Sequence, residues 1–169
     1  CGYGRIGKTL CTILKRKAVD LVVIEKDKDL IPVMVENKIF YISGDAGDET
    51  NLIKAGIRHA KGLIAVLETD TDNVFLVLTA RQLNPDIYIM ANASHNESKP
   101  KLIAAGANRV ELPYDMGAVS MAQRIIRPTV TNFLNLAFAQ KRKDIQMEEI
   151  PVSPSSELVN VMLKDSGIR

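Results

Sequence analysis

The opening residues carry the spacing best suited to hold a ligand. Glycines stand at positions 2, 4 and 7, which is the pattern G-x-G-x-x-G. In a dinucleotide-binding turn the first glycine permits a tight turn out of a strand, the second lets the backbone approach a pyrophosphate, and the third lets the helix pack closely on the sheet. The phosphates then lie at a helix N-terminus, where free N–H groups and the helix dipole favour negative charge.

Glu25 adds a second group to this pattern. It ends the next apolar run of the sequence, the place where a carboxylate can accept hydrogen bonds from a ribose diol. The glycine spacing is weak evidence by itself, and the pairing with Glu25 is what makes a dinucleotide site our first hypothesis.

The same segment also fits a second phosphate-binding pattern. Gly2, Gly7, Lys8 and Thr9 match G-x-x-x-x-G-K-T, the phosphate loop in which the lysine reaches β/γ phosphates, the threonine binds magnesium and an acid at a strand end completes the metal site. The extra glycine at position 4 shortens the loop, and the helical period already begins at position 6. We therefore favour the dinucleotide turn and keep a nucleotidase as the alternative.

Acidic residues gather just beyond the expected strand ends, at Asp45, Glu68, Asp70 and Asp72. Open parallel sheets bind ligands at this edge, and calcium prefers carboxylate ligands, so Asp45, Glu68 and Asp70 are candidate calcium ligands. Residues 70–73 also fit helix N-capping, and they lack the glycine and the final glutamate of an EF-hand loop. We favour capping and keep the calcium site as the alternative.

The groups that an enzyme would need are missing from the pattern. No tyrosine is followed by lysine four positions later, so the signature of short-chain dehydrogenases is absent. His59 and His95 have no partner acid at a recognisable spacing, and we expect them on the solvated surface. Binding without catalysis is the favoured hypothesis, and a fragment of an NAD-dependent dehydrogenase is a further alternative.

The elements that position these groups follow from apolar periodicity. Strands are expected at 21–25, 39–43, 62–67, 87–91 and 109–112, and amphipathic helices from residue 6 and at 28–36, 49–55, 72–83 and 97–105. Such alternation requires parallel pairing with right-handed crossovers. The glycine turn also needs a strand before it, so we expect a longer polypeptide with six strands. The predicted fold class is α/β, with a Rossmann-like doubly wound parallel sheet.

The pattern changes after Pro113. Residues 116–139 form a long apolar helical stretch in which Pro128 predicts a kink or a division. A helix that extends past the sheet needs a surface to pack on, and a second copy of the chain is the simplest candidate, with folding back on its own domain as the alternative. Residues 140–169 predict a linker, a strand and a capped helix that begin a C-terminal subdomain. The predicted domains are 1–115, 116–139 and 140–169.

Composition excludes several classes of function. The net charge of the 169 residues is only +2 and the basic runs are short, so no nucleic-acid partner is expected. The two cysteines have neither metal-ligand nor disulfide spacing. No apolar run approaches the roughly 18 residues that cross a bilayer.

With residues 2–7, 22–27, 44–46 and 105–110 in view, the sequence resembles the RCK family, the regulator of K⁺ conductance domains also called TrkA-N or KTN. The resemblance implies a cytoplasmic, non-enzymatic module that forms homodimers and higher rings. Its nucleotide occupancy would act on a potassium-conducting membrane pore in the same chain or in a separate subunit. Family ligands are NAD(H) or the adenine nucleotides AMP, ADP and ATP, and some members bind Ca²⁺.

The resemblance also implies roles for single positions. The phosphate cradle would consist of Gly2, Tyr3, Gly4, Arg5, Ile6 and Gly7, Glu25 would hold ribose, and Asp45 with Ala46 would border the adenine. From its place just beyond an expected strand end, Glu68 is also a predicted member of the nucleotide site. Residues 116–139 resemble the helix that crosses to the paired subunit. One departure is Asn92, which stands between two alanines where the family often has arginine.

Overall fold

The computed structural model describes residues 1–127 and Ser156. The chain divides into two units, Cys1–Ala118 and Val119–Arg169, and the sheet belongs to the first. Residues 128–139 of the predicted dimerisation helix, with the expected break at Pro128, lie outside the described residues, as do the strand and helix expected in 140–169 apart from Ser156.

In the described residues, five short parallel strands form a two-stranded and a three-stranded sheet. They are β1 (Val22–Glu25), β2 (Phe40–Ser43), β3 (Gly62–Ala65), β4 (Tyr88–Asn92) and β5 (Arg109–Glu111). β1 pairs with β2, and β4 lies between β3 and β5. Every described strand overlaps a segment predicted from apolar periodicity, and the bounds differ by at most two residues.

Cys1 and Gly2 join the two sheets. The Gly2 N–H donates to the Ile24 carbonyl at 2.9 Å on the β1 side. On the β3 side the Cys1 nitrogen donates to the Ile64 carbonyl at 2.7 Å, and the Val66 N–H donates to the Cys1 carbonyl at 3.0 Å. The order across the sheet is therefore β2, β1, the opening residues, β3, β4, β5. The predicted Rossmann-like doubly wound fold is confirmed, and the opening residues lie at its topological switch point.

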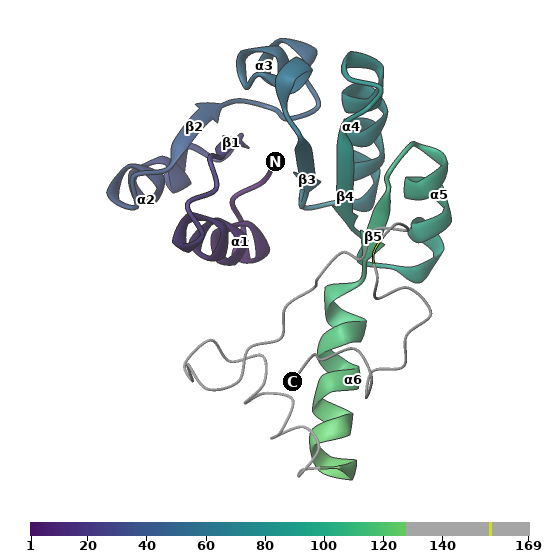
Figure 1. Cartoon of the computed structure of the whole chain (residues 1–169). Helices are drawn as coiled ribbons and strands as arrows, with labels where there is room; N and C mark the ends of the chain where they lie inside the picture. Colours follow the sequence, from purple (N-terminus) through teal and green to yellow (C-terminus); the bar gives the residue numbers. More distant parts are fainter. Residues whose placement is uncertain (128–155, 157–169) are drawn as a thin grey trace. The chain divides into compact units, whose positions relative to one another are not determined.

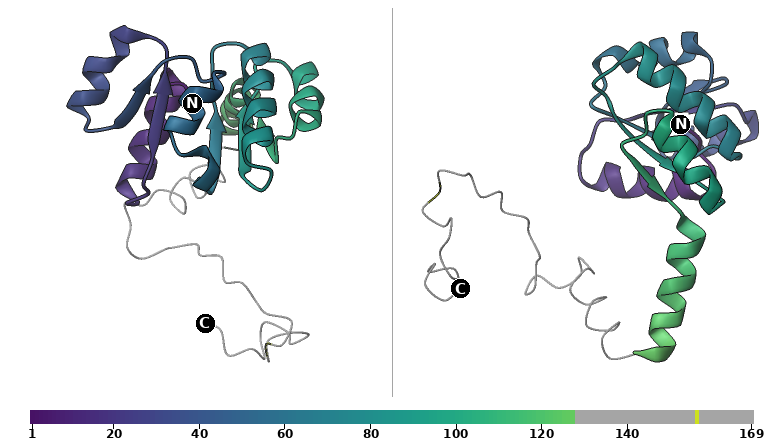
Figure 2. Two further views of the ribbon diagram at one scale, coloured as in Figure 1. Left: turned by 90° about the horizontal axis from the view of Figure 1, so that it is seen from above. Right: turned by 90° about the vertical axis from the view of Figure 1, so that its right-hand side faces the viewer.

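Helices alternate with these strands as predicted (Figure 1). The described helices are α1 (Arg5–Arg16), η1 (Lys28–Leu30), α2 (Ile31–Glu36), α3 (Glu49–Lys54), η2 (Ile57–His59), α4 (Asp70–Leu83), η3 (Asn96–Ser98), α5 (Lys99–Ala104) and α6 (Pro113–Ile126). α4 packs against β3 and β4, with α3 and α5 as its neighbours (Figure 2).

The start of α4 differs from the sequence prediction. The helix begins at Asp70, and Thr69 is its N-cap, with the Thr69 hydroxyl accepting from the Asp72 N–H at 3.0 Å. Asp70 and Asp72 lie in the first turn, where acids interact favourably with the helix dipole. The cap side chain is thus a threonine that the sequence pattern did not select.

Two buried clusters hold the sheet. The larger surrounds β3 and β4 and contains Leu76, Ile89 and Leu102, each fully buried. The smaller contains Tyr3 and Met34, between α1, α2 and β1. Because the Tyr3 side chain is only 3% exposed, its burial anchors the glycine turn to the core.

α6 begins at Pro113, three residues before the predicted start, because proline suits the first position of a helix. None of its residues is buried. Several of its apolar side chains are exposed, among them Met116, Val119, Met121, Ile125 and Ile126. Within the described residues, every helix falls short of the length and hydropathy that a membrane crossing requires.

Candidate functional site

The opening turn depends on its first and third glycines for geometry. Gly2 has a φ of +94°, in the left-handed region, and a Cβ there would lie 2.5 Å from the Val66 carbonyl oxygen. A Cβ on Gly7 would collide with the Gly2 carbonyl oxygen. Gly4 differs, because a Cβ there would meet nothing within 4 Å. Gly2 and Gly7 therefore shape the turn, while Gly4 leaves open space beside the backbone.

The N-terminus of α1 lies at this open position. Gly4 is the N-cap and provides no side-chain hydrogen bond, and the first turn of this 12-residue helix contains no acid. The first N–H groups of a helix lack intrahelical partners. An anion in front of Gly4 would satisfy them and would interact favourably with the helix dipole.

The same helix start excludes a phosphate-loop geometry. Because α1 begins at Arg5, both Lys8 and Thr9 lie inside the helix and not at the end of a loop. The Thr9 hydroxyl donates to the Arg5 carbonyl at 3.1 Å, within its own helix. The Lys8 ammonium lies 5.8 Å from the centroid of the Tyr3 ring. The turn has the shape of the dinucleotide pattern.

Glu25 connects the end of β1 to the glycine turn. Its Oε2 accepts from the Tyr3 N–H at 2.5 Å, its Oε1 accepts from the Asp27 N–H at 2.9 Å, and the residue is only 9% exposed. A carboxylate has about four lone-pair positions, so two remain for a ligand. The sequence indicated the carboxylate but not these two backbone partners.

A cleft of about 540 Å³ opens at the carboxyl ends of the strands. Its wall contains eight of the ten predicted nucleotide-site residues: Gly2, Gly4, Arg5, Ile6, Glu25, Asp45, Ala46 and Glu68. The other two are not in the wall, because Tyr3 points into the core and Gly7 packs on Gly2. The wall also contains residues outside the predicted site: Ile24, Lys26, Asp27, Leu30, Val66, Leu67, Asp72, Asn92, Ser94, Pro113 and Tyr114. Most of these follow a strand end, which is the signal that could have identified them.

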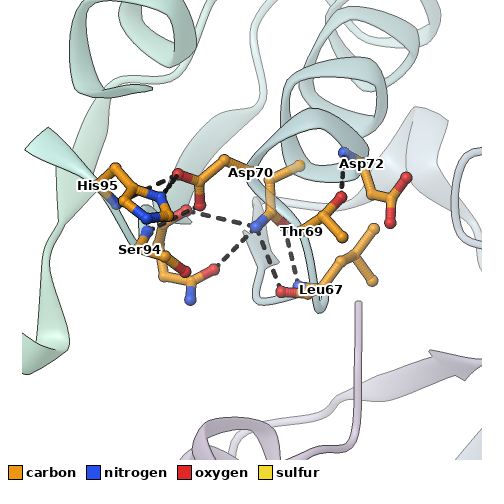
Figure 3. A network of polar contacts seen from close by, with 8 residues as sticks. Leu67, Thr69, Asp70, Asp72, Ser94 and His95 are labelled. Carbon is orange, nitrogen blue, oxygen red and sulfur yellow. Dashed lines mark hydrogen bonds and ion pairs between the residues drawn. The ribbon is translucent and has the colours of Figure 1, made fainter. Parts of the chain in front are cut away.

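The structure does not bring the three candidate calcium ligands together. Among the described residues, no group of three or more His, Cys, Asp or Glu side chains could hold a metal ion. Asp45 accepts from the Gly47 N–H at 2.7 Å. Asp70 is turned toward the loop after β4, where it accepts from the Ser94 N–H at 2.7 Å and from the His95 N–H at 3.2 Å (Figure 3).

His95 has an acidic partner that its position in the sequence did not indicate. Its Nδ1 lies 3.4 Å from Asp70 Oδ2, while the imidazole is 80% exposed. Burial acts to raise the pKa of Asp70, but hydrogen bonds from the backbone of Ser94 and His95 and from the Ser98 and His95 side chains outweigh it, and the pKa lies below its ordinary value. The expected solvent exposure of His95 is correct, and the expectation that it lacks a partner acid is wrong.

Comparison with known proteins identifies the family. Residues 1–113 match the model of the TrkA-N domain. The chain belongs to the TrkA-N domain family. It is 42% identical over 176 residues to "Probable potassium channel protein 2" of Methanocaldococcus jannaschii, an alignment that covers 100% of this chain and 51% of that protein. This TrkA-N chain spans about half the length of the curated relatives it matches.

Solved structures of the GsuK channel are among those that resemble this TrkA-N domain. The GsuK channel bound to NAD is 33% identical with a TM-score of 0.68, over 80% of this chain and 24% of that one. GsuK bound to ADP is 35% identical with a TM-score of 0.65, over 73% of this chain and 32% of that one. The family that the sequence resembled is thereby confirmed, and a TrkA-N domain is favoured over a dehydrogenase fragment or a nucleotidase.

Proposed function

We propose that this TrkA-N domain is a cytoplasmic ligand-sensing module of a potassium channel or transporter. It binds NAD(H) or an adenine nucleotide and couples its occupancy to the gating of K⁺ transport. The observation that carries the proposal is the uncapped N-terminus of α1, which faces a cleft beside Glu25 at the switch point of the sheet. The NAD and ADP bound in the GsuK structures support the choice of ligand class.

Different residues of the cleft bind different parts of the nucleotide. The backbone around Gly4 holds the phosphates, and Arg5 in the cleft wall adds a positive charge. Glu25 accepts hydrogen bonds from the hydroxyls of the adenosine ribose through the lone pairs that the backbone leaves free. Asp45 and Ala46 border the adenine, and Glu68 lines the opposite wall.

Sensing requires only that the ligand bind one conformation better than another, since that difference in affinity shifts the equilibrium. Residues 116–139 pair two copies of the chain, and ring assembly connects the pairs to a potassium-conducting pore. No proton or hydride relay is needed, so the domain is expected to bind its nucleotide without turnover.

Thermal unfolding of the full chain tests the proposal. A ligand that binds only the native state at 100 times its Kd stabilises it by about 2.7 kcal/mol. We expect at least one of NAD⁺, NADH, ADP and ATP to raise the Tm, with no product formed during incubation. If none of these nucleotides raises the Tm at millimolar concentration, the proposed sensing function is refuted.

A further inference from the structure

A buried asparagine forms hydrogen bonds to the ends of both β3 and β4 beside the cleft. Asn73, in the first turn of α4, is fully buried. Its Oδ1 accepts from the Leu67 N–H at 2.9 Å, and its Nδ2 donates to Asn92 Oδ1 at 3.0 Å. The same Nδ2 lies 3.4 Å from the carbonyl oxygens of Leu67 and Asn92. Leu67 follows β3 and Asn92 ends β4, so one side chain fixes the spacing of two strand ends.

Asp70 extends this attachment to the next loop. From the same turn of α4 it accepts from the N–H groups of Ser94 and His95 (Figure 3). The first turn of α4 therefore holds the end of β3, the end of β4 and the loop after β4 in one arrangement.

The residues held in this way form one side of the cleft. Leu67, Asn92 and Ser94 line it, together with Glu68, whereas Asn73 itself does not. The other side is formed by Glu25 and the residues after β1 and β2, with the glycine turn between the two sides. A volume of about 540 Å³ lies within the roughly 300 to 1,000 Å³ of small-molecule sites.

The two sides suit the two halves of a dinucleotide. In doubly wound sheets the dinucleotide lies across the crevice, with the pyrophosphate at the helix N-terminus and the acid after the next strand on the adenosine ribose. Glu25 therefore assigns the adenosine to the β1 side. A mononucleotide such as AMP needs that side and the glycine turn alone, and only the second nucleoside of a dinucleotide reaches the β3 and β4 side.

We propose that Asn73 is a positioning residue for the second nucleoside of a bound dinucleotide. It holds the Leu67 backbone and the Asn92 side chain in place for that half of the ligand, without touching the ligand itself. The inference rests on the proposed nucleotide binding and adds that α4 favours a dinucleotide over a mononucleotide. Removing Asn73 would leave the partly buried Leu67 N–H without its acceptor and Asn92 without its donor, so both would find new partners and move.

Titration calorimetry of the full chain with NAD⁺ and with AMP tests this role. Asn73→Ala is expected to weaken NAD⁺ binding roughly tenfold, which corresponds to the loss of about one hydrogen bond, and to change AMP affinity less than about twofold. Asn84→Ala is the matched control. Asn84 follows the other end of α4, donates to the carbonyls of Ile57 and Ala60 at 2.8 and 3.3 Å, and is absent from the cleft wall. The Asn84→Ala substitution should lower the Tm without altering the ratio of the NAD⁺ and AMP affinities.

Three results would overturn the proposal: NAD⁺ affinity unchanged in Asn73→Ala, both ligands weakened by the same factor, or wild-type protein that binds NAD⁺ no more tightly than AMP. If Asn73→Ala does not fold, Asn73→Asp keeps the size and the acceptor for Leu67 while removing the donor to Asn92, and the same affinity ratio decides. Wild-type protein that binds neither ligand would refute the proposed function itself. Wild-type protein that binds both, with an unchanged ratio in the variants, would refute only the role of Asn73.

Discussion

The Tyr3 N–H donates to Glu25 Oε2 at 2.5 Å, so the carboxylate that ends β1 is fixed to the backbone of the glycine turn. A second bond from the Asp27 N–H holds the other oxygen. Glu25 is thus part of the frame of the cleft as well as a group that faces it. A ligand that bonds to Glu25 therefore acts directly on the connection between β1 and the start of α1.

Replacing Glu25 with alanine should weaken both nucleotide binding and the fold. We expect ADP or NAD⁺ binding to fall by roughly 1.5 to 3 kcal/mol, the range for hydrogen bonds to a charged group. The Tm should also fall, because two N–H groups lose their acceptor. Calorimetry and thermal unfolding measure the two effects, with the exposed Glu36→Ala on α2 as the control. Unchanged affinity would remove the ribose assignment.

Gly4→Ala should separate binding from folding. Gly4 has a φ of −66°, which alanine adopts, and its Cβ would meet nothing within 4 Å. Stability should therefore change by less than about 0.5 kcal/mol. The added methyl group occupies the space in which the phosphates approach the backbone, so nucleotide affinity should fall at least about tenfold. If Gly4→Ala binds as tightly as wild type, the phosphates do not lie against this turn.

Gly7→Ala, in contrast to Gly4→Ala, should lower the stability of the fold itself. A Cβ on Gly7 collides with the Gly2 carbonyl, and relief of that collision must displace either α1 or the turn. Overpacking of this kind costs about 1 to 3 kcal/mol, which thermal unfolding detects without ligand. A Tm equal to that of wild type would mean that the contact between Gly2 and Gly7 is dispensable.

Lys8→Ala distinguishes the two phosphate-binding patterns in solution. Lys8 lies within α1 near the Tyr3 ring and is absent from the cleft wall. We expect affinity for ADP and NAD⁺ to change less than about twofold, since Lys8 does not line the cleft and the ring next to it is buried in the core. Complete loss of nucleotide binding in this variant would favour the nucleotidase hypothesis over the dinucleotide turn.

The sequence predicted those features that depend on local spacing. The strand positions follow from apolar runs. The turn follows from three glycines that lie within a few residues of one another. The partners of Glu25, Asp70 and Asn73 could not be predicted in the same way. They are backbone groups or side chains brought together by the packing of strands, and backbone N–H groups have no sequence signature. Asp70 and His95 meet because α4 begins beside the loop that follows β4, a relationship that only the sheet order establishes.

The carboxylate of Asp70 makes the stability of the domain depend on pH in acid. Its pKa in the folded protein lies below the ordinary value, which is about 3.9 in an unfolded chain. The ionised form therefore stabilises the fold at every pH above about 4, and this contribution disappears as the pH falls through the folded pKa. Asp70→Asn should lower the Tm at pH 7, because an amide oxygen replaces a charged acceptor for the Ser94 and His95 N–H groups.

Thermal unfolding of wild type and Asp70→Asn between pH 3 and pH 7 measures this contribution. The difference in Tm should be constant from pH 7 to about pH 5 and should shrink as the pH falls below about 4, because Asp70 takes up a proton in the unfolded chain before it does so in the folded protein. The exposed Asp86→Asn is the matched control and should show a small difference throughout. A Tm difference that stays the same at pH 3 would contradict the role of the charge, and it would assign the effect of the substitution to packing alone.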